Sequence, residues 1–204
     1  MSLRRILSGL VVALALGGAS AAPAVGAKAP VEPPRITSAV AVDTRTVDLD
    51  WTAVKGAHHY VVSYVGGETY TSATSARITD LYPGDEHFFY VTAETRKNRP
   101  LGSSEWVYVA TPPEGPGAPG WTDGGDGSVR LTSGSGIGCA TFDLGRLAED
   151  GTYTSLGDGE DRGGGLRAWY VAQGAGTTAT YAVRCQGSGG LWSTWSEPTV
   201  VTLS

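Results

Sequence analysis

One pattern occurs twice in this chain: a turn followed by a strand in which apolar and polar residues alternate. The first copy covers residues 81–93, and a looser second copy covers residues 176–185. Each copy is followed by a further alternating strand, which ends at Thr111 in one case and at Thr202 in the other. Recurrence of such a unit indicates a repeated architecture, and short strands joined by turns are typical of a β-sandwich. The repeat therefore predicts two small all-β domains of one type.

The first 27 residues have the organisation of a secretory signal peptide. Arg4 and Arg5 form a charged start, residues 6–16 form an apolar run, and small residues follow. Cleavage is possible after residues 19–21 or after residues 25–27, and the sequence does not choose between them. The apolar run is shorter than the about 20 residues that a spanning helix needs. No Cys follows the run and no second hydrophobic segment stands near the C-terminus, so we expect a secreted, extracellular protein without a stable membrane anchor.

Composition narrows the class of partner. Asp and Glu number 20 against 15 Lys and Arg, and the resulting net charge of −5 argues against nucleic acid or an anionic membrane as the ligand. Glycine, with 30 of 204 residues, is about twice as frequent as in an average protein, which fits many tight turns between short strands. Arg is much commoner than Lys, and Ala and Gly are abundant, a usage typical of bacteria with GC-rich genomes.

Proline and glycine mark the boundaries between the parts of the chain. Residues 28–34 are expected to be an extended lead-in, and residues 113–118 a linker, because proline cannot donate to a strand ladder. These breaks predict domains at 35–112 and 119–204. The glycine-rich tract at 157–165 is predicted to be a mobile loop. Alternating segments predict strands at 47–51, 60–64, 76–78, 89–93 and 107–111 in the first domain, and at 128–131, 140–144, 153–156, 166–172, 180–186 and 199–203 in the second.

The first domain has a Pro-rich entry, Trp51 on the second strand, Tyr60-x-Val62-x-Tyr64 on the third, the corner Leu81-x-Pro83-Gly84, and the end Thr111-Pro112-Pro113. With these motifs it resembles a fibronectin type III domain over nearly its whole length, residues 33–112. One position departs from the family: His87 stands where a Tyr hydroxyl usually ties the corner to the backbone, and we expect a ring nitrogen of His87 to replace that hydroxyl. Asp85 likewise stands where the family usually has Thr.

The second domain, residues 116–204, resembles the same family more distantly, because no Trp stands on the 128–131 strand and no Pro-Gly pair precedes Tyr181. Its segment Trp192-Ser193-Thr194-Trp195-Ser196 matches the Trp-Ser-x-Trp-Ser motif of cytokine-receptor type III domains. In those domains the Trp rings stack on cations from the adjacent strand. The resemblance implies a structural stack of Trp192, Trp195 and Arg184, in which each cation–π contact contributes about 0.5–2 kcal/mol. We interpret the motif as packing and infer no cytokine binding from it.

The two cysteines, Cys139 and Cys185, are expected to form a disulfide. An even pair within one domain of an exported protein is more often a disulfide than a metal site. In the expected topology the start of the third strand lies beside the end of the sixth, which brings the two residues together. Simple alternation, however, places Cys139 on the outer face and Cys185 on the inner face. A bulge at Gly136 or Gly138 would reorient Cys139.

The sequence contains no recognisable catalytic motif, and we expect a protein that is not an enzyme and uses no cofactor. The adjacent His58 and His59 point to opposite faces if they begin a strand, which disfavours a shared metal. Two acidic loops offer oxygen ligands for Ca²⁺, one with Asp123 and Asp126, the other at 158–161. Neither matches a known calcium loop, and a solvated acidic turn is the favoured interpretation, so no metal site is assigned.

The strongest functional signal is a set of aromatic residues on one face of the first domain. If Phe89, Val91, Val107 and Val109 point inward, alternation sends their neighbours outward. Cross-strand pairing that only stabilises the sheet is an alternative role for them. Beside them lies a basic turn, which either contacts an anionic envelope polymer or is simply solvated. The outward aromatic residues are Phe88, Tyr90, Trp106 and Tyr108, and the basic residues are Arg96, Lys97 and Arg99.

These observations lead to a secreted, non-enzymatic binding or adhesion module, with a protein partner at the cell envelope or outside the cell. The alternative is a carbohydrate-binding accessory module of polysaccharide degradation, since similar domains accompany bacterial glycoside hydrolases. The sequence leaves the ligand, the oligomeric state and the orientation of the domains open.

Overall fold

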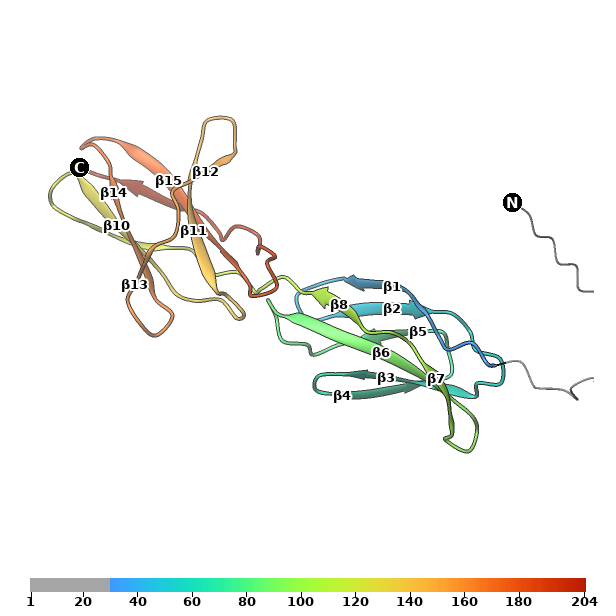
Figure 1. The fold of residues 1–204 in the computed structure, drawn as a ribbon. Helices are drawn as coiled ribbons and strands as arrows, with labels where there is room; N and C mark the ends of the chain where they lie inside the picture. Colours follow the sequence, from blue (N-terminus) through green and yellow to red (C-terminus); the bar gives the residue numbers. More distant parts are fainter. Residues whose placement is uncertain (1–29) are drawn as a thin grey trace, which may run out of the picture. The chain divides into compact units, whose positions relative to one another are not determined.

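The computed structural model describes residues 30–204, and the predicted signal peptide lies outside them. The described residues form two β-sandwiches, shown in Figure 1. No helix in residues 30–204 is long and apolar enough to cross a membrane. All strand pairs in both sandwiches are antiparallel, as expected for strands joined by short turns.

The first sandwich consists of a three-stranded and a five-stranded sheet. The smaller sheet has the order β1-β2-β5, and the larger has the order β4-β3-β6-β7, with β8 also paired to β6. Its strands are β1 (Ile36–Ala41), β2 (Val47–Trp51), β3 (His59–Tyr64), β4 (Gly67–Thr71), β5 (Ser75–Ile78), β6 (Glu86–Glu94), β7 (Pro100–Ser103) and β8 (Val107–Ala110).

Alternation along the strands builds the core between these sheets. On β2, Val47, Leu49 and Trp51 are buried, whereas the intervening Asp48 and Asp50 face away from the core. The same period on β6 buries Phe89, Val91 and Ala93. Trp51 packs edge-on against Tyr60 of β3, with ring centroids 5.6 Å apart, and so joins the two sheets.

His87 closes the corner before β6. Its imidazole is buried, and Nε2 lies 2.9 Å from the carbonyl oxygen of Tyr82 and 3.3 Å from the hydroxyl of Thr111. The Thr111 hydroxyl in turn donates to the same carbonyl oxygen, at 3.2 Å. A ring nitrogen of His87 therefore makes the expected contact with the backbone at this corner.

The second sandwich repeats the plan with two four-stranded sheets, of orders β13-β14-β10-β9 and β12-β11-β15-β16. A separate hydrophobic cluster fills it, including Leu131, Phe142, Tyr181 and Val201. Its strands are β9 (Gly120–Asp123), β10 (Ser128–Ser133), β11 (Thr141–Leu147), β12 (Tyr153–Ser155), β13 (Glu160–Asp161), β14 (Arg167–Ala172), β15 (Thr178–Gln186) and β16 (Thr199–Thr202).

The tract at 157–165, predicted to be a mobile loop, contains a short strand and forms hydrogen bonds with neighbouring strands. It contains β13, whose two residues pair with Ala168 and Arg167 of β14. The carbonyl oxygen of Gly157 accepts hydrogen bonds from the Leu144 amide at 3.2 Å and from Trp169 Nε1 at 3.0 Å. Glycine is required at position 159, because a Cβ there would lie 2.6 Å from the Trp169 ring.

Trp169 also explains how the second sandwich fills its core without a Trp on β10. The indole is 5 % exposed and belongs to β14, where Trp169 pairs with Leu131 of β10. In the first sandwich the core Trp belongs to the central strand β2 itself. The core Trp of the second sandwich therefore lies on β14, the neighbour of β10, whereas the core Trp of the first lies on β2.

Candidate binding surface

Four aromatic side chains gather on the outer side of the larger sheet of the first sandwich. Phe88 on β6 lies directly opposite Tyr108 on β8, with ring centroids 6.1 Å apart. Trp106 stands just before β8, and its ring centroid lies 5.3 Å from that of Phe88 and 4.3 Å from that of Tyr90. We call Phe88, Tyr90, Trp106 and Tyr108 the aromatic face.

The aromatic face lies outside the core. Tyr108 is 63 % and Trp106 is 49 % exposed, whereas Phe89 and Val91, between the outward residues of β6, are fully buried. The rings meet at interplanar angles between 53° and 67°: Phe88 and Trp106 pack edge-on, and the other two pairs are tilted. An edge-on arrangement is favoured by the ring quadrupoles and leaves ring surface open to solvent.

Two further exposed side chains, which the sequence did not predict, extend this side of the sheet. Tyr70 on β4 is 65 % exposed, and Val65, in the turn after β3, is 62 % exposed. The Tyr70 hydroxyl donates to the Glu68 carboxylate at 2.9 Å, and this hydrogen bond and the nearby negative charge raise the pKa of Tyr70. The alternation of Glu68 and Tyr70 after the Gly66-Gly67 turn was the signal that could have revealed β4.

The second sandwich offers an internal comparison, because its strands have the same pairing. Phe88 and Tyr108 pair across β6 and β8 as Thr180 and Val200 pair across β15 and β16. Carrying that register along the strands places Ala182 at the position of Tyr90. Pro198 follows Ser196-Glu197 as Trp106 follows Ser104-Glu105. The sandwich therefore folds with small or non-aromatic residues at all four positions.

Carboxylates surround the aromatic face. Glu68 and Glu86 are exposed on the outer side of the same sheet, and exposed Glu105 precedes Trp106 in sequence. A depression beside Phe88 is also acidic, since Asp80, Asp85 and Glu86 line it. Arg77, which lines it too, is engaged in a bidentate ion pair with Asp48. The depression is lined by Tyr64, Val65, Gly66, Thr69, Arg77, Thr79, Asp80, Leu81, Tyr82, Asp85, Glu86, His87 and Phe88.

The basic turn, which the sequence places beside the aromatic face, instead connects β6 to β7 at the end of β6 away from Phe88. The Thr95 amide donates to the Arg99 carbonyl oxygen at 3.0 Å, and the Asn98 amide donates to the Thr95 carbonyl oxygen at 2.9 Å. Asn98 has φ of 54°, a left-handed conformation that Asn tolerates better than most residues. Arg96, Lys97 and Arg99 all have exposed side chains on this turn.

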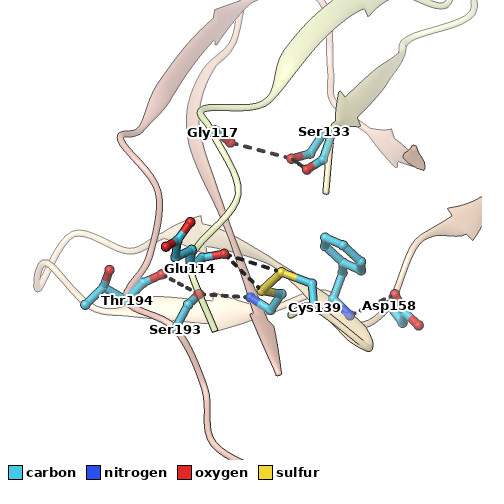
Figure 2. Close-up of a disulfide and its surroundings, with 10 residues drawn as sticks. Glu114, Gly117, Ser133, Cys139, Asp158, Ser193 and Thr194 are labelled. Atoms are coloured by element: carbon cyan, nitrogen blue, oxygen red, sulfur yellow. Dashed lines mark hydrogen bonds between the residues drawn. A yellow bond between two sulfur atoms is a disulfide. The ribbon is translucent and has the colours of Figure 1, made fainter. Parts of the chain in front are cut away.

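Cys139 and Cys185 form a disulfide, with Cα atoms 5.4 Å apart (Figure 2). The predicted conflict between their faces does not arise, because Cys139 lies before β11 begins and not within it. Phe142, three residues later, is the residue that pairs with Cys185. Both sulfur atoms approach the carbonyl oxygen of Glu114, at 3.6 Å and 4.0 Å, so the disulfide also contacts the linker.

Trp192, Trp195 and Arg184 lie in one stack on the outer side of the second sandwich. The Arg184 guanidinium carbon is 4.5 Å from the Trp192 ring centroid and 4.3 Å from that of Trp195. The guanidinium also donates to the Asp143 carboxylate at 2.9 Å, and the Asp143 side chain is only 6 % exposed. A Cβ on Gly145 would lie 2.7 Å from Trp195, so glycine at that position gives the ring its room.

Two serines fasten the segment that carries these Trp residues to β15. The Ser193 hydroxyl accepts a hydrogen bond from the Cys185 amide at 3.1 Å and donates to the Thr194 carbonyl oxygen, as Figure 2 shows. The Ser196 hydroxyl does the same between the Val183 amide and the Glu197 carbonyl oxygen. Each serine thus replaces a missing strand partner, which gives the motif a structural role.

Carboxylates of both acidic loops accept hydrogen bonds or form ion pairs within the second sandwich. Asp126 accepts hydrogen bonds from the hydroxyl and the amide of Ser128, and these bonds hold its pKa below the ordinary value. Asp123 accepts from the Gly125 amide. Asp158 accepts from the Phe142 amide at 3.3 Å (Figure 2), and Glu160 forms an ion pair with Arg162. In residues 30–204 no three His, Cys, Asp or Glu side chains gather as a metal site would require.

The adjacent histidines have separate surroundings. His59 Nε2 lies 3.0 Å from the Glu94 carboxylate on the outer side of β3 and β6. His58 is exposed, with its ring centroid 5.8 Å from that of His59.

No family model matches the sequence, and no curated protein sequence matches it either. Among solved structures, a two-domain fibronectin type III segment of chicken tenascin is similar, with a TM-score of 0.51 and 14 % identity. That alignment covers 83 % of this chain and 98 % of the tenascin segment. A fibronectin type III domain of the human collagen alpha-1(XX) chain is 27 % identical over 46 % of this chain and 96 % of that domain, with a TM-score of 0.37. The chain therefore has an all-β fold of two tandem sandwiches of the fibronectin type III kind.

Proposed function

We propose that this chain is a secreted, non-enzymatic binding module whose aromatic face binds a protein partner at the cell envelope or outside the cell. One observation carries the proposal. At the four positions of the aromatic face, the second sandwich has Thr180, Ala182, Pro198 and Val200 and folds in the same way. Because the fold does not need aromatic residues there, a contact role is the better explanation for them.

The surroundings of the aromatic face favour a protein with basic residues around an apolar centre. Trp and Tyr supply large contact areas at a small cost in rotamer entropy, and they dominate the energetics of protein interfaces. The exposed Glu68, Glu86 and Glu105 would then meet Lys or Arg of the partner at the rim, where charge complementarity steers association.

Secretion agrees with two features of the chain. The first 27 residues have the organisation of a signal peptide. The disulfide between Cys139 and Cys185 is of a kind that persists in oxidising compartments and is rare in a reducing cytosol.

A carbohydrate-binding role is the second candidate, and the exposed ring surface of Trp106 favours it, because planar rings also stack on sugars. A glycan array separates the two candidates. Binding to a neutral glycan that is lost on Trp106→Ala would assign the face to carbohydrate.

Capture from native culture fluid, with the whole mature chain as bait, tests the proposal. We expect one protein to be retained by the wild-type chain and lost with the double variant Trp106→Ala, Tyr108→Ala. Its affinity should fall by about 2 kcal/mol or more, as truncation of interface hot spots does. Val200→Ala is the matched control, because Val200 is 61 % exposed at the position equivalent to Tyr108. Equal capture by the double variant, with an unchanged melting temperature, would contradict the proposal.

A further inference from the structure

The first sandwich contains seven Lys and Arg residues, of which two form ion pairs and five do not. Arg45 and Arg77 form ion pairs, with Glu114 and Asp48. The other five cations of this sandwich are exposed and form no ion pair within residues 30–204. These five are Arg35, Lys55, Arg96, Lys97 and Arg99.

Two backbone hydrogen bonds bring the segments with these five residues to the same end of the sandwich. The Thr52 amide donates to the Arg35 carbonyl oxygen at 2.9 Å, so the start of β1 lies beside the end of β2. The His58 amide donates to the Glu94 carbonyl oxygen at 2.7 Å, which places the turn containing Lys55 beside the end of β6. The basic turn follows directly after β6 (Figure 1). We call Arg35, Lys55, Arg96, Lys97 and Arg99 the basic end.

We propose that the basic end binds a linear anionic polysaccharide, at a site separate from the aromatic face. Unpaired cations gathered on neighbouring turns repel one another, and a polyanion relieves that repulsion while it releases its own counterions. The three Arg side chains each present a planar fork that binds a carboxylate, sulfate or phosphate oxygen pair in a bidentate way. Uronate, sulfate and phosphate polymers share this chemistry.

The negative charge of the rest of the chain favours a single polymer strand over a membrane surface or a long duplex as the ligand. With a net charge of −5, the chain would bring its acidic parts against a membrane or a long duplex. A single polysaccharide strand can contact the basic end alone. Tyr70, which is exposed and lies with its ring centroid 6.3 Å from that of His59, adds a ring surface next to this end.

The test uses the full mature chain and defined probes: heparin, polygalacturonate, neutral dextran, a single-stranded oligonucleotide and phosphatidylglycerol vesicles. Two double variants, R96Q/K97Q and R35Q/K55Q, each remove two cations of the basic end. The control R146Q/R162Q removes the same charge from the second sandwich. All of the substituted side chains are exposed, so the variants are expected to fold, and their melting temperatures verify this.

We expect the wild-type chain to bind heparin or polygalacturonate with a strong dependence on salt concentration and not to bind dextran. Each double variant should bind about tenfold more weakly at low salt, and each lost contact should flatten the salt dependence by up to about one in log–log slope. The control should bind like wild type. Equal weakening by the control would reduce the effect to net charge and overturn the proposal, as would unchanged binding by both variants. Tighter binding to the oligonucleotide or the vesicles would overturn the choice of polysaccharide. Because the Trp106→Ala, Tyr108→Ala variant leaves the basic end intact, this result and that for the aromatic face can fail independently.

Discussion

At the scale of single residues, each sandwich depends on one polar side chain that satisfies a buried or partly buried polar group. His87 fixes the corner of the first sandwich through one ring nitrogen, and Arg184 neutralises a nearly buried carboxylate in the second. In both cases a single side chain satisfies a polar atom that would otherwise lose its contact with water. Such positions are sensitive to substitution, because an unsatisfied buried polar group costs more than a hydrogen bond gains.

His87→Ala is expected to destabilise the first sandwich by about 1–3 kcal/mol, since it leaves a cavity and removes a donor from the Tyr82 carbonyl oxygen. Urea unfolding followed by Trp fluorescence measures the loss. His58→Ala, at an exposed ring, should leave the midpoint almost unchanged. Equal midpoints for both variants would show that the corner does not depend on the imidazole.

Arg184→Met should cost about 2–3 kcal/mol, less than the about 3–5 kcal/mol typical of a fully buried pair, because Arg184 is partly exposed. The substitution leaves Asp143 charged and nearly buried. Asp143→Asn in the same chain should restore part of the loss, because it removes that charge. A double-mutant cycle in guanidinium gives the coupling, and additive losses would rule out the ion pair as a stabilising contact.

At the scale of strands and turns, alternation predicted the larger elements well. Strands β2, β3, β6, β14 and β15 lie where the alternating residues placed them, because the core-facing residues of each strand recur with a period of two. The chain also brought Cys139 and Cys185 together as the topology required.

What alternation could not give were contacts that depend on neighbouring strands. β13 has only two residues and forms because they pair with β14, and the glycine-rich tract around them carries no strand signal. The position of Cys139 follows from where β11 begins, which periodicity does not fix. The alternation of Glu68 and Tyr70 indicates a strand, but only the pairing of β4 with β3 places Tyr70 on the outer side of the larger sheet.

Trp169→Ala tests whether a core Trp moved to β14 supports the second sandwich. The loss of a buried indole should cost about 3–5 kcal/mol, and the Gly157 carbonyl oxygen also loses its indole donor. Trp121→Ala on β9, where the ring is 38 % exposed, should cost much less. Guanidinium unfolding monitored by circular dichroism compares the two, and a similar loss for both would contradict this role of Trp169.

At the scale of the whole molecule, the hydrophobic core is divided into two clusters that share no residue. One cluster lies within residues 31–109 and the other within residues 129–203. This division supports the domain boundaries that the sequence predicts, at 35–112 and 119–204, which we retain as a proposal. Separate cores imply that each sandwich has its own stability.

Removal of the disulfide tests that independence. Cys139 and Cys185 are 46 residues apart, and closing a loop of this length stabilises a fold by up to about 4 kcal/mol in the chain-entropy model. Both cysteines belong to the second sandwich, so the double variant Cys139→Ser, Cys185→Ser should lower the unfolding temperature of that sandwich alone. Differential scanning calorimetry of the full chain should then show one transition moved and one unchanged.

His87→Ala serves as the reciprocal control, because it should move only the other transition. A single transition that shifts as a whole in both variants would mean that the two sandwiches unfold as one cooperative unit.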